Sequence, residues 1–224
     1  MATTIPSIAC LGVIGRNNNP LHITIFPSYD PASNTRAPLR TPLQFSLLLS
    51  STLDIFDTRA RRAATTAPNT STAATATAAG SAPLLTGDFG LLHAVDERLA
   101  AYGFETNTGV KFVAVVDMRG RYSGGLGPAG SAPGGAGGGV AGMRGGVGLR
   151  ETELRVVFRA MQTAYVRLLQ NPFYDPDEHA PLAGPGGGGG GGGGGVGGKR
   201  ITSHKFAEEM RRIGEGWAPG VTNL

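Results

Sequence analysis

The sequence predicts an α+β domain in which helices cover both faces of a single sheet. Residues 7–16 are apolar at successive positions, which is typical of a strand that is buried on both sides. Three later segments carry apolar residues at helical spacing, and each needs a surface on which to bury its apolar stripe. The expected order of elements is β-β-α-β-β-β-α-α.

Glycine- and alanine-rich tracts interrupt this domain. The chain has 224 residues, of which 37 are glycine, and much of this glycine lies in tracts. We interpret residues 62–87, 119–148 and 177–199 as low-complexity insertions. Such tracts have few side chains whose burial could offset the entropy that is lost when the backbone becomes ordered. Without them about 145 residues remain, enough for one domain with its own core. We therefore expect one domain over residues 1–224, interrupted three times.

The charge, the cysteine content and the hydropathy narrow the class of protein. The net charge is +4, and the insertions carry about +3 of it, so the folded part is nearly neutral and we expect no nucleic-acid partner. Cys10 is the only cysteine, which excludes an intramolecular disulfide. No apolar run reaches the roughly 18 residues of a membrane span, and the N-terminus lacks the basic start of a signal peptide. The cytoplasm is the expected compartment.

The first two elements are predicted to form a hairpin. Residues 7–16 and 21–26 read as strands, and the turn cluster at residues 17–20 joins them. A polar connection follows. Thr41, Pro42 and Gln44 then match the N-cap, first-turn proline and capping-box positions of a helix.

This first helix has one face to bury and one to expose. At 100° per residue, its apolar stripe consists of Phe45, Leu48, Leu49, Thr52, Leu53 and Phe56. The opposite side carries Leu43, Leu47, Ser50 and Asp54. Two leucines beside a carboxylate on a solvent side are candidates for partner binding. The alternative is that Asp54 is a solvated helix acid near Arg61.

The remaining elements follow in order. Residues 88–97, 98–106 and 110–117 suggest three short strands in a meander, with a hairpin signal at residues 107–109. Residues 149–170 form the clearest helix, which Asn171 and Pro172 end. After Ser203 a short helix is predicted, with a buried stripe of Phe206, Met210, Ile213 and Trp217.

No constellation of residues indicates catalysis, so we expect no enzyme, no cofactor and no metal. Histidines 22, 93, 179 and 204 lack metal-ligand spacing. His93 with Asp96 and Glu97 could form an acid–base cluster, but a turn between strands is the simpler role for these acids. Residues 193–199 mimic a phosphate-binding loop, yet Arg200 stands where Ser or Thr is required.

Six short segments together resemble a known family. They are Ile8 to Arg16 with Pro20 to Ile23, Thr52 to Asp57, Tyr102 to Asp117, Leu149 to Arg159, Asn171 to Pro176 and Ser203 to Met210. In this order they resemble the longin fold, and more narrowly the sedlin-like subunits of the transport protein particle (TRAPP) complex, subunit 2-like branch. The resemblance covers the domain without its insertions.

The resemblance implies a fold and a non-enzymatic function. The fold would be a five-stranded, mainly antiparallel longin (profilin-like) sheet with one helix on one face and two on the other. The chain would be a scaffold subunit of a vesicle tether in ER-to-Golgi and Golgi transport, peripheral to these membranes. Its partners would be other subunits and, indirectly, a Rab-type GTPase that the assembly activates. The counterpart of Asp54 is associated with partner contacts in this family.

Site residues and rival interpretations follow from these observations. We expect partner binding at Leu43, Leu47 and Asp54, and at the segment Asn171, Pro172, Phe173 and Tyr174. One alternative is a longin module of another trafficking complex, such as a small adaptor subunit. Another is an RNA-associated protein that acts through Gly/Arg-rich loops, because residues 119–121 and 143–146 resemble RGG segments.

Overall fold

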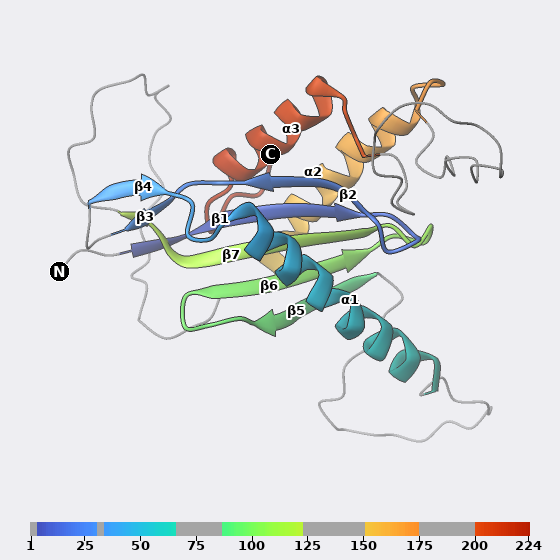
Figure 1. Ribbon diagram of the computed structural model, residues 1–224, viewed down its shortest axis with the longest axis horizontal. Coiled ribbons are helices and arrows are strands. Elements are labelled where there is room, and N and C mark those ends of the chain that lie inside the picture. The colour runs from blue at the N-terminus through green and yellow to red at the C-terminus, as the bar shows by residue number, and fades with distance from the viewer. Residues whose placement is uncertain (1–3, 31–33, 66–86, 123–150, 175–199) are drawn as a thin grey trace, which may run out of the picture.

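The computed structural model describes residues 4–30, 34–65, 87–122, 151–174 and 200–224. Five strands form one antiparallel sheet in the order β2-β1-β7-β6-β5 (Figure 1). The strands are β1 (Thr4–Ile14), β2 (Pro20–Ile25), β5 (Asp88–Ala94), β6 (Leu99–Glu105) and β7 (Lys111–Tyr122). The predicted hairpin and the predicted three-strand meander are both confirmed.

The structure adds a small ribbon that the sequence analysis missed. β3 (Ser28–Asp30) and β4 (Thr35–Ala37) pair in a separate two-stranded sheet, where a polar connection was expected. Each strand is only three residues long. At this length neither strand shows an alternating apolar pattern from which it could be recognised.

Two elements extend into predicted insertions. The first helix, α1 (Pro42–Thr65), extends into the predicted insertion 62–87, and β7 extends to Tyr122 inside the predicted insertion 119–148. In β7 the pairing with β1 continues through Ile5 and Arg121, because strand pairing joins backbone N–H and C=O groups and so tolerates glycine as well as larger residues. Apart from these ends and Gly87, the three predicted insertions lie outside the described residues.

All three predicted helices are present, and the N-caps predicted for the first and the last are confirmed. They are α1, α2 (Glu151–Leu169) and α3 (His204–Gly216). At the start of α1, the Thr41 amide donates to Gln44 Oε1 at 2.9 Å and the Gln44 amide donates to Thr41 Oγ1 at 3.3 Å, a reciprocal capping box. The hydroxyl of Ser203 caps α3 by accepting from the Phe206 amide.

The sheet separates two hydrophobic clusters, with α1 on one face and α2 and α3 on the other (Figure 1). Along β7, Val113 and Val115 belong to the α1 side, whereas Phe112, Ala114 and Val116 belong to the α2/α3 side. This alternation with a period of two is the expected pattern of a strand covered on both faces. The predicted α+β fold with one helix opposite two is confirmed.

The two clusters are packed in different ways. On the α1 side the sheet presents small residues, and a Cβ atom built on Gly12 or Gly103 would meet the side chains of Leu49 or Phe56 within 3 Å. On the other side large rings fill the space, among them Phe112, Phe158, Tyr165, Phe206 and Trp217. α1 therefore lies close against its strands, while α2 and α3 rest on a layer of aromatic side chains.

Candidate partner-binding surfaces

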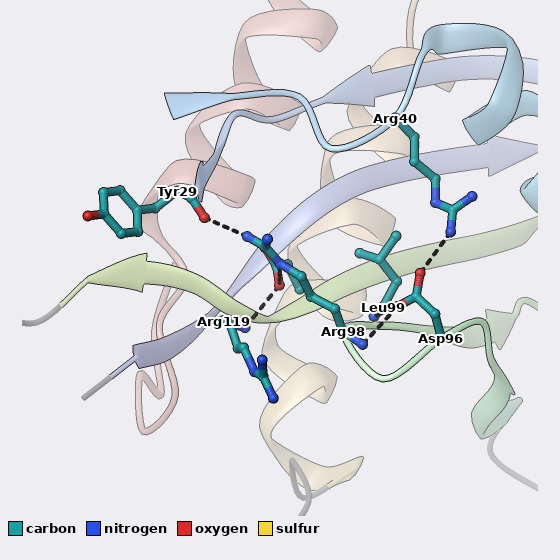
Figure 2. A network of polar contacts seen from close by, with 7 residues as sticks. Tyr29, Arg40, Asp96, Arg98, Leu99 and Arg119 are labelled. Atoms are coloured by element: carbon teal, nitrogen blue, oxygen red, sulfur yellow. Dashed lines mark hydrogen bonds and ion pairs between the residues drawn. The ribbon is translucent and has the colours of Figure 1, made fainter. Parts of the chain in front are cut away.

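The beginning of α1 is held in place by a polar network. In the loop before the helix, Arg40 Nη2 lies 2.7 Å from Asp96 Oδ2 in the turn between β5 and β6 (Figure 2). The other carboxylate oxygen of Asp96 accepts from the amides of Arg98 and Leu99, at 2.8 and 2.6 Å. Burial alone would raise the pKa of Asp96, but the hydrogen bonds from Arg40, Leu99 and Arg98 bring this pKa below its ordinary value. The predicted turn role of Asp96 is confirmed.

A second part of the network fixes the β3–β4 ribbon to the sheet. The guanidinium of Arg98 donates to both carboxylate oxygens of the buried Asp117 at 2.9 Å, and also to the carbonyl oxygen of Tyr29 in β3 (Figure 2). The amide of Arg119 is a further donor to Asp117. The hydrogen bonds to Asp117, together with the negative charge of this residue, raise the pKa of Arg98. Through Arg98 and Asp96, the ribbon, the turn and the start of α1 form one connected unit.

The distal part of α1 is fixed by a different contact. Arg59 donates through Nη1 to the carbonyl oxygen of Phe89, and through Nη2 to that of Leu91, at 2.5 and 2.6 Å. Both carbonyls belong to β5. The helix is thus anchored near both ends, and the orientation of its outer side chains follows from the packing of the stripe beneath.

The outer face of α1 carries the predicted residues in the predicted orientation. Leu43 is 69% exposed and Leu47 is 63% exposed, and Ser50 and Asp54 are exposed on the same side. Among the described residues, no hydrogen bond or ion pair involves the Asp54 carboxylate, so Arg61 does not neutralise it. We name these four residues the α1 surface. It combines two large apolar side chains with an unpaired negative charge.

The segment after α2 is only partly as predicted. Asn171, Pro172 and Phe173 are exposed, with Phe173 at 89%. Tyr174 instead packs against the α2/α3-side core, so its ring is not a free contact. Asn171 has a local structural role, because its Oδ1 accepts from the Phe173 amide and its carbonyl accepts from the Tyr174 amide. This turn presents Phe173 to solvent.

Two exposed apolar residues of α2 were not among the predicted site residues. Val166 and Leu169, on the last turns of the helix, are 47% and 43% exposed. They lie three residues apart on one side of α2, and Phe173 follows in the turn after the helix. The sequence pattern could have indicated Val166 and Leu169, because both flank the buried stripe of α2, as Leu43 and Leu47 flank that of α1. We name Val166, Leu169 and Phe173 the α2-end surface.

The other residues considered for chemistry have structural environments. Cys10 is buried in the α1-side cluster, and this burial raises its pKa, which disfavours the reactive thiolate. Trp217 is fully buried and donates to the Glu153 carbonyl, so it belongs to the predicted stripe. Within the described ranges, no cluster of three or more His, Cys, Asp or Glu residues is arranged for a metal ion. His179 and residues 193–199 lie outside these ranges.

Comparison with known proteins assigns the family. The family model described as "Sedlin" matches residues 13–183, which is more than half of the chain. The chain belongs to the sedlin family. It is 25% identical over 171 residues to proteins called "Trafficking protein particle complex subunit 2-like protein" from Mus musculus, Bos taurus and Xenopus tropicalis. Each match covers 75% of this sedlin-family chain and 84% of the relative.

The family assignment agrees with the fold and gives context to the surfaces. The matched residues begin within β1 and continue past α2, so the match includes both candidate surfaces. Among the helices that the structure describes, none combines the length and the apolar character needed to cross a bilayer. The predicted partner-binding roles of Leu43, Leu47, Asp54 and residues 171–174 stay predictions.

Proposed function

We propose that this chain is a non-enzymatic scaffold subunit of a TRAPP-like vesicle-tethering complex. The observation that carries the proposal is the extent of the similarity, because it covers 84% of the length of relatives named as trafficking protein particle complex subunit 2-like proteins. A match of this extent covers three quarters of the chain and not one shared motif. The proposed location is cytoplasmic, peripheral to ER and Golgi membranes through the complex.

The structure supports binding rather than chemistry as the activity. The α1 surface exposes two leucines. Burial of their side chains against a partner would favour binding by about 25 cal/mol per Å² of apolar area removed from water. The adjacent unpaired carboxylate of Asp54 would contribute mainly to specificity, by favouring one partner and one orientation, and less to affinity. We propose that a neighbouring subunit binds here, and that the α2-end surface makes a further contact. By assembling the complex, the chain would support nucleotide exchange on a Rab-type GTPase without contributing a catalytic group.

One rival interpretation loses part of its basis. The RNA-associated alternative depends on arginines in residues 119–121 and 143–146. Arg121 lies in β7 and donates to the carbonyl oxygen of Glu215 in α3, so it holds two elements of the fold together. The second segment, residues 143–146, lies outside the described residues.

Asp54→Tyr tests the proposed α1 surface. The substitution removes the charge and adds bulk at an exposed position, so partner binding should be lost while the free energy of unfolding changes by less than about 0.5 kcal/mol. The measurement is affinity purification of the tagged full-length chain followed by mass spectrometry, with a denaturation curve on the same protein. We expect co-purifying tether subunits with the wild type and their loss with the variant.

A matched control is available at Glu215. This residue is an exposed acid on α3, which covers the other face of the sheet, so Glu215→Tyr makes a similar change in charge and size away from α1. Normal co-purification by Asp54→Tyr, or equal loss with Glu215→Tyr, would contradict the α1 surface. Recovery of the wild type without any tether subunit would contradict the proposed function itself.

A further inference from the structure

A hollow between α2 and α3 is lined by several arginines. It measures about 390 Å³. Its lining includes Arg155, Arg159, Thr163 and Arg167 from α2, Glu209 and Arg212 from α3, and residues 222–224 of the C-terminal tail. Val156, Ala160, Ala164 and Ile213 provide an apolar floor. We name this feature the α2/α3 groove.

The α2/α3 groove is basic, and two of its arginines have no internal partner. Arg155 pairs with Asp88 at 2.9 Å, and Arg167 pairs with Glu209 at 3.1 Å. In the described part of the chain, no hydrogen bond or ion pair involves the guanidinium groups of Arg159 and Arg212. The sequence of α2 after Glu153 contains no acid, so Arg159 has no acid three or four residues away on its own helix. An uncompensated positive charge therefore faces the groove.

The arrangement is not what helix stability alone would favour. Arg155 and Arg159 lie four residues apart on α2, and like charges at this spacing destabilise a helix by about 0.2–0.5 kcal/mol. An ordinary solvated face would alternate acids and bases at this spacing. Concentrating arginines along one wall of a hollow instead favours an acidic ligand, for which the guanidinium fork is well suited.

We propose that the α2/α3 groove binds a short acidic segment of a partner protein in extended conformation. Residues four apart on a helix rise by about 6 Å along its axis, and alternate residues of an extended chain are about 6.6 Å apart. Carboxylates at every second position could therefore meet the row of groups along α2, with Arg212 opposite. This surface lies on the other side of the sheet from the α1 surface, and the proposal does not depend on that surface.

The shape and the lining favour a peptide over other anionic partners. A hollow between two helices suits a narrow chain better than the surface of a bilayer. No residue that lines the α2/α3 groove is aromatic, so the stacking platform typical of single-stranded nucleic-acid sites is missing from it. An acidic protein segment needs neither a flat surface nor a ring to stack on.

Fluorescence anisotropy on the full-length chain tests the proposal. The probe is a fluorescein-labelled peptide of Glu-Ser repeats, about eight residues long, and the reference is the corresponding Gln-Ser peptide. We expect the Glu-Ser peptide to bind at least about tenfold more tightly than the reference, and added salt to weaken its binding. The double variant Arg159→Glu/Arg212→Glu should lower the affinity at least about tenfold, since it replaces attraction by repulsion.

The matched control changes the same number of charges on α3. Lys205 and Arg211 are exposed but do not line the groove, so Lys205→Glu/Arg211→Glu should keep the affinity within about twofold. If the groove variant fails to give the wild-type circular-dichroism melt, Arg159→Gln/Arg212→Gln replaces it. Asp54→Tyr should bind the peptide normally, which separates this test from that of the proposed function.

Specific outcomes would overturn the proposal. One is equal binding of the two peptides, and another is equal loss with the groove and control variants, which would show a response to net charge alone. A third is that phosphatidylserine vesicles or a poly(U) RNA bind more tightly than the peptide and lose this binding with the groove variant. In that case the groove would serve a lipid or nucleic-acid partner instead.

Discussion

α1 and the α2/α3 pair cover opposite faces of the same sheet, yet they are held to it differently. Beneath α1 the strands offer Gly12 and Gly103, and the helix approaches until its leucine and phenylalanine side chains fill the space above these glycines. Beneath α2 and α3 the space is filled by rings, with Trp217 completely buried among them. The glycines in the strands should make the α1 layer sensitive to added atoms. The α2/α3 layer contains Trp217, the largest fully buried side chain that the structure describes, and should be sensitive to removed atoms, although Gly214 of α3 also lies close to the ring of Phe26.

The largest effect is expected from a deletion on the α2/α3 side. Trp217→Ala removes a fully buried ring and its hydrogen bond to the Glu153 carbonyl, and should lower the free energy of unfolding by about 3–5 kcal/mol. Urea denaturation monitored by circular dichroism measures this loss. Trp217→Phe keeps an aromatic body and should cost about 1–2 kcal/mol less than the alanine variant. A loss below about 1 kcal/mol for Trp217→Ala would contradict the expected sensitivity of the α2/α3 layer to removed atoms.

A smaller effect is expected from an addition on the α1 side. A Cβ atom at Gly103 would lie 2.5 Å from both Phe56 Cζ and Leu92 Cδ1, so Gly103→Ala should destabilise the fold by about 1–3 kcal/mol. At Gly12 the added atom would meet the flexible end of Leu49, at 2.7 Å. Gly12→Ala should therefore cost less than Gly103→Ala in the same denaturation assay. The reverse order would show that α1 shifts as a whole and is not held close by its glycines.

The smallest effect is a pH dependence confined to the α2/α3 side. The ring of His22 packs edge-on against Phe206 of α3 and lies 2.8 Å from the Thr24 hydroxyl, and burial lowers its pKa below the ordinary value of 6.5. The folded state therefore disfavours the protonated ring. Its contribution to stability is complete above pH 6.5 and is lost as the pH falls from there through the folded-state pKa.

His22→Gln should remove this part of the pH dependence. Denaturation curves for both proteins at several pH values between about 7 and 5 measure the difference in slope. Stability of the wild type should fall with pH more steeply than that of the variant. Parallel curves would show that His22 is solvated well enough to be protonated without cost.

Most of the fold could be predicted because its signals are local. The capping box at Thr41, the helix stop after Gln170 and the cap at Ser203 each depend on a few neighbouring residues. The β3–β4 ribbon could not be predicted in this way, because it is held by Arg98, whose partners Tyr29 and Asp117 are 69 and 19 residues away in the sequence. The continuation of β7 to Tyr122 likewise depends on pairing with β1, which a glycine-rich composition conceals.

The candidate surfaces were predicted to different extents. Helical periodicity was sufficient to place Leu43, Leu47 and Asp54 on the outer face of α1, since the orientation follows from the buried stripe. It was not sufficient for Tyr174, because no periodic element contains this residue and only the tertiary fold brings it against the core. The α2/α3 groove was also beyond prediction, since it needs α2, α3 and the C-terminal tail in their spatial arrangement.

The contact between Arg59 and β5 affects the association of one copy of this domain with another. An exposed edge strand can pair with a strand of another molecule, and proteins commonly protect such edges with charged side chains. β5 is the outermost strand on its side of the sheet, and Arg59 already occupies the carbonyl oxygens of Phe89 and Leu91. A strand of another copy would have to displace the guanidinium group of Arg59 before it could pair with β5. Arg59 should therefore protect this edge against edge-to-edge association of the sheets.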